Sequence, residues 1–228
     1  MSDTRTSRPI PLALTMLVAF FAALAALAVS NGHDAMAHGN EPAHTPIATD
    51  KADALRADMR VFWEDHIVWT RLAIISLTAG TADTEATVAR LLRNQTDIGN
   101  AVKPFYGKAA GNKLTAELRK HILIAADVVV AAKAGDRAKL ADAQARWRAN
   151  ADDIAGVLAS VNPRHWKLGA MKAEMHKHLA LTTEEAVARI GGDWAGDVAA
   201  YDKVHRHILH MSDALADGLI KQFPKRFR

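Results

Sequence analysis

The sequence contains no cysteine, and it holds only 5 Trp, 2 Tyr and 6 Phe among its 228 residues. The absence of cysteine excludes disulfide bonds, thiolate metal ligands, haem attached through a CxxCH motif and cysteine nucleophiles. Glycine and proline are scarce in the body of the chain, whereas Ala, Val, Ile and Leu supply most of its apolar residues. This composition is typical of a helical protein.

Common catalytic and nucleotide-binding motifs are absent too. The chain has no HExxH, no GxSxG, no Walker loop and no GxGxxG. Within the predicted helices no Glu lies three residues before a His, so the paired Glu-x-x-His motifs of di-iron carboxylate bundles are missing. The nearest spacing of this kind is Asp202-x-x-His205. The sequence therefore indicates no particular reaction, and a role other than catalysis is expected.

The charge pattern argues against a nucleic-acid partner. The net charge of +4 is mild, and the 29 Lys and Arg residues are spread among 25 Asp and Glu residues. A nucleic-acid-binding domain normally carries a basic face. The one basic cluster is predicted to be a solvated helix end, with contact to a membrane surface as the alternative, and it consists of Lys221, Lys225, Arg226 and Arg228.

The N-terminal segment has the organisation of a signal peptide. Arg5 and Arg8 precede an uncharged apolar run over residues 10–29, and Ala35-Met36-Ala37 then supplies the small-x-small pattern that a signal peptidase recognises. We predict a signal peptide over residues 1–37, cleaved after Ala37. The mature protein is then periplasmic or secreted.

Two alternatives to this cleavage remain open. An apolar run of about 20 residues is just long enough to cross a membrane, so an uncleaved segment would tether the protein as an N-terminal anchor. Cleavage after Ser30 would instead leave Asn31-Gly32-His33 at the N-terminus, a sequence that can chelate copper through its amine, amides and imidazole.

The remainder is predicted to be a flexible linker over residues 38–50 and a helical bundle domain over residues 51–228. Apolar residues recur at spacings of three and four, and no window alternates with period two over a useful length. Short loops favour antiparallel neighbours. The predicted fold is an all-α antiparallel bundle of four to five long helices plus a short helical insert. The expected helix breaks are Gly80, Pro104 with Gly107, Gly135, Asn162-Pro163 and Gly191-Gly192.

Two further signals refine this division into helices. Asp83, Asn112, Asp136 and Asp193 are predicted to cap helix N-termini. Thr182 and Glu185 have the spacing of a capping box, which predicts that the short insert begins there.

Several polar residues interrupt the apolar stripes of these helices. His66, His121 and His178 occupy core-facing positions on three different helices, and Asn150 does so on a fourth, with Asp153 one turn further on. Burying an imidazole without a hydrogen-bond partner costs about 1–3 kcal/mol. We therefore expect these side chains to meet one another, carboxylates, water or a metal ion.

The functional interpretation is a transition-metal site in the bundle core, for zinc, copper, iron or nickel. His66, His121 and His178 would be ligands, and Asn150 and Asp153 would orient them or complete the shell. Carboxylates about one turn before a histidine are further candidates: Glu117, Glu174 and Asp202. Asp97 and Asp213 are further possible ligands or hydrogen-bond acceptors for the ligands.

Other interpretations stay open. The buried histidines could be a hydrogen-bond network in a structural or protein-interaction bundle, or His and Asp could serve as general bases in a hydrolase or transferase. Haem held without a covalent bond is another possibility, with ligands among Met171, Met175, Met211 and His178. His205, His207 and His210 cluster on the last helix, and adventitious metal binding at the surface is expected there.

Six segments of the chain resemble a family of uncharacterised bacterial helical proteins. Some members of that family carry a glycosyltransferase label, but this sequence has neither an Asp-x-Asp motif nor the pattern of a nucleotide-sugar-binding fold. The resemblance implies that seven polar residues lie in or beside recurring segments: His66, Asn94, Asp97, His121, Asn150, Asp153 and His178. The segments are FWEDHIVWTR (62–71), LLRNQTDIGNAV (91–102), FYG (105–107), WRANADDIA (147–155), HLALTTEEA (178–186) and GLIKQFP (218–224).

Overall fold

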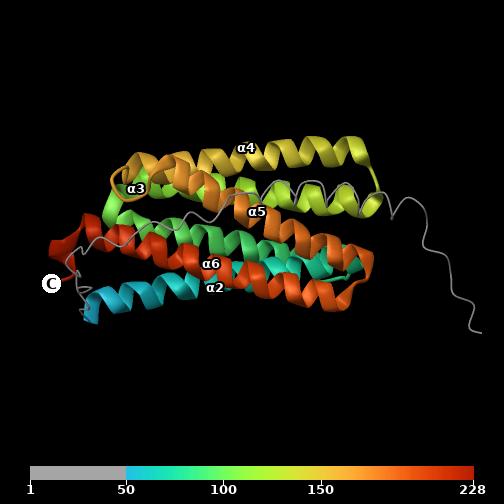
Figure 1. Ribbon diagram of the computed structural model, residues 1–228, viewed down its shortest axis with the longest axis horizontal. Coiled ribbons are helices and arrows are strands. Elements are labelled where there is room, and N and C mark those ends of the chain that lie inside the picture. Colours follow the sequence, from blue (N-terminus) through green and yellow to red (C-terminus); the bar gives the residue numbers. More distant parts are fainter. Residues whose placement is uncertain (1–49) are drawn as a thin grey trace, which may run out of the picture.

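The structure, a computed structural model, describes residues 50–228 and is helical throughout that range (Figure 1). The predicted all-α bundle is thereby confirmed. The predicted signal peptide and almost all of the linker lie outside the described residues. The helices are α2 (Asp50–Ala79), α3 (Thr84–Ala134), α4 (Arg137–Val161), α5 (Leu168–Gly191) and α6 (Trp194–Gln222), followed by a 3-10 turn, η2 (Pro224–Arg226).

The helix ends follow local stop and start signals. Gly135 ends α3 in the left-handed conformation with φ of 69°, which glycine adopts without steric cost. The next residue, Asp136, caps α4 by accepting a hydrogen bond from the Lys139 N–H at 3.1 Å. At the start of α6, Asp193 accepts from the Gly196 N–H at 2.9 Å. These turns confirm the predicted breaks.

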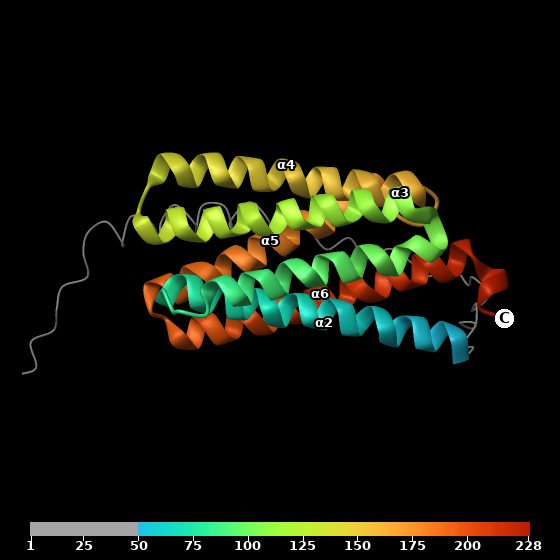
Figure 2. The ribbon, with the colours of Figure 1, turned by 180° about the vertical axis from the view of Figure 1, so that it is seen from behind.

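Helix α3 reverses direction in its middle, so it supplies two antiparallel segments to the bundle. Gly107 has φ of 83° and ψ of 169°, which is outside the helical region. Seen from behind, the chain of α3 runs along the bundle, turns at one end and returns beside itself (Figure 2). The predicted break at Pro104 and Gly107 is therefore a tight reversal rather than a loop. The helix already runs through residues 108–111, so Asn112 lies inside it and its prediction as a cap is wrong.

The two segments of α3 approach each other most closely at a pair of glycines. A Cβ atom on Gly99 would lie 2.8 Å from the backbone oxygen of Gly111 and would overlap the Thr115 hydroxyl. The threonine side chain can rotate away, but the backbone oxygen cannot. Any larger side chain at position 99 must therefore push the two segments apart.

We expect Gly99→Ala to lower the free energy of unfolding by about 1–3 kcal/mol, the usual cost of overpacking a close contact. Gly156→Ala in α4 is the matched control, because a Cβ atom there meets nothing within 4 Å. Helix propensity alone should make that change stabilising by about 1 kcal/mol. Urea unfolding monitored by circular dichroism measures both. Similar effects at the two positions would contradict the close approach.

The helices close into an elongated bundle around one main apolar core. Helix α3 packs against both α2 and α4, α5 packs against α4 and α6, and α6 returns to α2 (Figures 1 and 2). The largest buried side chains of this core include Trp63, Trp147 and Trp166. All five helices, α2 to α6, therefore contribute side chains to the middle of the bundle.

Helix α5 runs without interruption through the position predicted to start a short insert, so that detail of the prediction is wrong. The Thr182 hydroxyl donates to the His178 backbone oxygen at 2.9 Å, as a threonine inside a helix does. The Glu185 carboxylate accepts from Arg71 instead of capping a helix. Tertiary contacts therefore override the capping-box pattern.

Among residues 50–228, no helix combines the length and the apolar character needed to cross a membrane.

Candidate functional site

Four histidines form a layer across the middle of the bundle. His66 lies on α2, His121 on α3, His178 on α5 and His207 on α6, and each side chain is between 3% and 5% exposed. The ring of His178 is central, with its centroid 5.8 Å from His66, 6.2 Å from His121 and 6.3 Å from His207. The three histidines singled out in the sequence are thus brought together, and a fourth joins them.

The imidazole of His121 is fully hydrogen-bonded by the protein. The Asn150 amide donates to the Glu117 backbone oxygen at 3.2 Å and to its carboxylate at 2.9 Å, which turns the amide oxygen toward His121. His121 Nδ1 therefore carries the proton and donates to that oxygen at 2.9 Å. On the other side, the Trp147 indole donates to His121 Nε2 at 3.1 Å. Burial lowers the pKa of His121 to about 4, so the ring is neutral.

His66 is held by a chain of side-chain amides. The Asn94 amide donates to the Phe62 backbone oxygen at 2.9 Å, so the Asn94 side-chain oxygen is free to accept from Gln95 Nε2 at 3.0 Å. Gln95 Nε2 also donates to the Leu91 backbone oxygen at 2.9 Å, and it lies 3.2 Å from His66 Nδ1. Burial lowers the pKa of His66 to about 3, and the neighbouring His121 adds to the shift. His66 is therefore neutral.

His178 differs from its two neighbours because part of its ring has no partner. Its Nδ1 is buried and makes no hydrogen bond within the described part of the chain. Burial, with the other imidazoles around it, holds the pKa of His178 well below the ordinary value. An orphaned polar atom of this kind costs about 1–3 kcal/mol, so its retention points to a ligand or a bound water.

His207 was expected at the surface, yet it is buried against α5. Its Nε2 donates to the backbone oxygen of Glu174 at 3.1 Å. Its Nδ1 faces the Glu174 carboxylate, with Oε2 at 3.7 Å, and neither of these two atoms has a hydrogen-bond partner. The burial of His207 could have been predicted from the sequence, because it is three residues after Val204 and four before Met211 on the apolar stripe of α6.

Of the two remaining predicted residues, Asn150 lies in the layer and Asp153 does not. Asn150 is 1% exposed and contacts His121. The side chain of Asp153 is 57% exposed, and its Oδ2 lies 3.6 Å from the Lys120 ammonium. Three residues turn a helix by about 300°, which leaves Asp153 about 60° away from the inward direction of Asn150. Asp153 therefore does not belong to the side chains around the imidazoles.

The side chains of the layer are not already gathered around one point. Within residues 50–228 no group of three or more His, Asp or Glu side chains is arranged so that it could hold a metal ion. The hydrogen bonds of His121 are one reason, because both of its nitrogens are occupied by Asn150 and Trp147. A metal ion would therefore need different ligands or a rearrangement of side chains.

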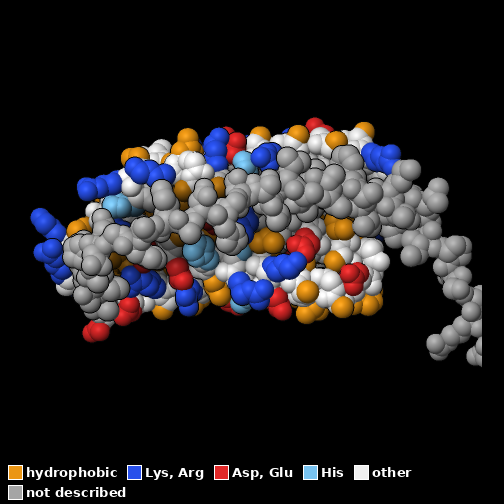
Figure 3. Space-filling model, viewed as in Figure 1, with side chains coloured by type: hydrophobic (Ala, Val, Ile, Leu, Met, Phe, Trp, Pro, Cys, Tyr) orange, Lys and Arg blue, Asp and Glu red, His pale blue; other side chains and the backbone are white. Residues whose placement is uncertain are grey.

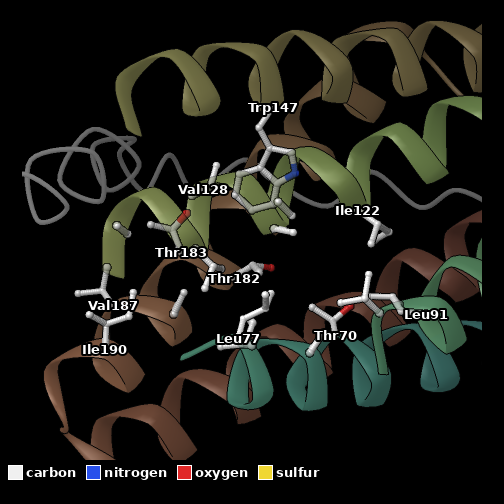
Figure 4. Close-up of a pocket in the computed structure, with 18 residues that line it drawn as sticks. Thr70, Leu77, Leu91, Ile122, Val128, Trp147, Thr182, Thr183, Val187 and Ile190 are labelled. Carbon is white, nitrogen blue, oxygen red and sulfur yellow. The ribbon is translucent and has the colours of Figure 1, made fainter. Parts of the chain in front are cut away.

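An apolar pocket adjoins the layer on the side toward the α5–α6 turn. Its cavity volume is about 50 Å³, and its walls come from α2, α3, α4 and α5. Figure 4 shows Thr70 and Leu77 facing Thr182 and Thr183 across the space, with Trp147 above them. A second apolar cavity of about 20 Å³ lies on the other side of the layer, between Met59, Trp63 and Met175 among others. The histidines thus form a polar partition between two apolar spaces.

A second buried polar cluster joins α2, α5 and α6. The Arg71 guanidinium lies 2.8 Å from the carboxylates of both Glu185 and Asp197, and it stacks over the Tyr201 ring at 4.7 Å. Arg189 reaches Asp197 at 3.2 Å. Burial raises the pKa of Glu185 to about 7, against the opposing effect of Arg71. Sequence reasoning missed this cluster, because Arg71 lies more than a hundred residues from Glu185 and Asp197 and only the tertiary fold pairs them.

Charged side chains are mixed over the surface shown in Figure 3. Lys and Arg alternate with Asp and Glu there, and basic side chains gather mainly at the end of the bundle where the chain terminates. Neither a family model, nor a curated protein, nor a solved structure matches this chain.

Proposed function

We propose that the protein is an exported binding protein that holds a small ligand in the polar layer of its bundle core, against His178. One observation carries the proposal: the Nδ1 of His178 is buried without a partner at the centre of three other imidazoles. The nitrogens of His121 are both taken by the protein, whereas Nδ1 of His178 and Nδ1 of His207 are left to bind something else. Export rests on the signal-peptide pattern of residues 1–37.

The free space beside the layer is small, which favours an ion or a ligand of a few atoms. Pockets for drug-sized molecules have volumes of about 300–1,000 Å³, whereas the cavity beside the layer has about 50 Å³. The imidazoles are neutral, because burial lowers the pKa of His66, His121 and His178. Neutral imidazoles present a lone pair without first losing a proton, which favours cations and hydrogen-bond donors as ligands.

Native mass spectrometry tests the proposal on full-length protein exported by its own N-terminal segment and purified without a histidine tag. We expect a mass above that of the polypeptide, and we expect the excess to disappear on unfolding and in His178→Leu. His176→Leu is the matched control, because His176 lies two residues away on α5 and pairs with Asp152 at 2.8 Å outside the layer. A folded protein whose native mass equals that of its polypeptide, and which takes up no added metal ion, would count against the proposal.

A second candidate is a structural or protein-interaction bundle with no ligand, in which the histidines serve only as a core network. The hydrogen bonds of His121 with Asn150 and Trp147 favour it. In that case His178→Leu should stabilise the protein and remove no bound mass, because leucine fills the space of a nitrogen that has no partner.

A further inference from the structure

We infer that Glu174, His178 and His207 form a binding site for one divalent transition-metal ion, of the class of Zn²⁺ or Co²⁺. This inference rests on the proposed function and names the ligand and its shell. Its basis is that three atoms of metal-binding type are all buried without a hydrogen-bond partner: Glu174 Oε2, His178 Nδ1 and His207 Nδ1. Each of the three can donate a lone pair to a cation.

The fold places these three side chains next to one another on α5 and α6. Glu174 and His178 are four residues apart on α5, so they lie one above the other on the same face of the helix. His207 faces them from α6, with its ring stacked 6.3 Å from that of His178 at an interplanar angle of 23°. Its Nδ1 lies 3.7 Å from Glu174 Oε2. Two helices thus supply all three ligands.

The electrostatics of the contact between Glu174 and His207 call for a positive charge. His207 Nε2 donates to the Glu174 backbone oxygen, so in the neutral ring Nδ1 carries only a lone pair. Glu174 Oε2 is also an acceptor when ionised, so the two atoms repel each other unless a proton or a metal ion lies between them. A metal ion bound at about 2.0–2.2 Å from each atom would bridge them.

The hydrogen bond on the far side of the His207 ring has the form found around bound metals. A metal-binding histidine usually donates its other ring N–H to a carboxylate or a backbone carbonyl, which fixes both its tautomer and its orientation. The bond from His207 Nε2 to the Glu174 carbonyl does this at 3.1 Å. His207 therefore needs no change of tautomer to bind a cation.

The same geometry provides a route for the ion and shows what must move. The Glu174 side chain is 30% exposed, whereas that of His207 is 3% exposed, so the carboxylate links the buried ring to solvent. Glu174 and His178 must turn about their side-chain torsions to converge with His207, since no such group is preformed among residues 50–228. Of the main metal-site residues predicted from the sequence, this shell retains only His178. Glu174 and His207 take the place of His66, His121, Asn150 and Asp153.

Titration of the EDTA-stripped full-length chain with Co²⁺ and Zn²⁺ tests the inference. We expect one Co²⁺ per chain, visible absorption bands of a low-coordinate Co²⁺ site, and displacement by one Zn²⁺. Glu174→Gln and His207→Gln should each weaken the affinity by roughly 100-fold or more, because each removes a ligand. The matched controls are Glu64→Gln and His205→Gln. These two residues also form a Glu–His pair, with His205 Nε2 2.8 Å from Glu64 Oε1, but the pair lies outside the layer. Both controls should leave the affinity unchanged.

The outcomes separate this inference from the proposed function. Co²⁺ binding that survives Glu174→Gln and His207→Gln but is lost in His178→Leu would overturn the shell named here and leave a binding protein. No binding of Co²⁺ or Zn²⁺ by the wild-type chain would overturn the inference, while a non-metal mass in the native spectrum would still support the proposed function. Should His207→Gln fail to fold, Glu174→Gln carries the test, because the Glu174 side chain is partly exposed.

Discussion

Replacing His121 by leucine should lower the free energy of unfolding of the metal-free protein by about 2–6 kcal/mol, because two buried partners each lose a hydrogen bond at about 1–3 kcal/mol. The Asn150 oxygen would lose the Nδ1 proton that it accepts at 2.9 Å. The Trp147 indole would lose the acceptor that it reaches at 3.1 Å. A leucine at this position can replace neither contact.

His178→Leu is the matched control, because His178 lies in the same layer and is equally buried. Its Nδ1 has no partner to lose, so the substitution should leave the stability of the metal-free protein unchanged or raise it. Urea unfolding in the presence of EDTA measures both variants. Equal losses in the two would contradict the division of the layer into a bonded and an unbonded imidazole.

The same pair of variants also separates structure from ligand binding. A ligand that binds only the folded state raises the midpoint of thermal unfolding. We expect added Zn²⁺ to raise the midpoint of His121→Leu as it does that of the wild type, and to leave that of His178→Leu unchanged. Loss of the Zn²⁺ effect in His121→Leu alone would restore His121 as a ligand.

Much of the fold could be predicted from local sequence signals. Gly135 followed by Asp136, and Gly192 followed by Asp193, combine a left-handed helix end with a capping side chain, and both turns occur where expected. The periodicity of the apolar residues also predicted, correctly, that His66, His121 and His178 lie inside the bundle. These features depend on residues a few positions apart, which is the range over which a sequence can be interpreted directly.

The errors arose where distant contacts decide the outcome. Thr182 and Glu185 have the spacing of a capping box, but the carboxylate is engaged by Arg71 from α2 and the helix continues. His207 was predicted to lie at the surface because it belongs to a dense cluster of histidines. It is in fact buried, since it lies on the apolar stripe of α6. Which ring nitrogen of each histidine is free depends on amides of other helices, and the sequence carries no signal for this.

Acidification should unfold the metal-free protein steeply, because its buried histidines titrate at lower pH when folded than when unfolded. The pKa is about 3 for His66 and about 4 for His121, and that of His178 is well below its ordinary value of 6.5. Their contribution to stability is fully present above pH 6.5 and is lost as the pH falls toward these values. Below about pH 6 the unfolded chain binds three more protons at these sites, and each lowers stability by about 1.4 kcal/mol per pH unit.

Glu185 acts in the opposite direction over part of this range. Burial raises its pKa from 4.5 to about 7, so the folded protein takes up this proton first and gains stability as the pH falls from about 7 to 4.5. Between roughly pH 6 and pH 4.5 the unfolded chain binds three extra protons at the histidines and the folded protein binds one extra proton at Glu185. The free energy of unfolding therefore falls by about 3 kcal/mol for each pH unit of acidification. A typical domain has only about 5–15 kcal/mol to lose, so we expect the unfolding transition to fall in this window.

Urea unfolding at a series of pH values between 7.5 and 4.5, with EDTA present, measures this slope. Glu185→Gln is the informative variant, because glutamine resembles the protonated acid and does not titrate. Its stability should fall more steeply than that of the wild type, by about 1.4 kcal/mol per pH unit more. A stability that stays constant across this range would mean that the folded protein binds as many protons as the unfolded chain. That result is incompatible with the neutral ring of His121, whose Nδ1 donates to Asn150 while its Nε2 accepts from Trp147.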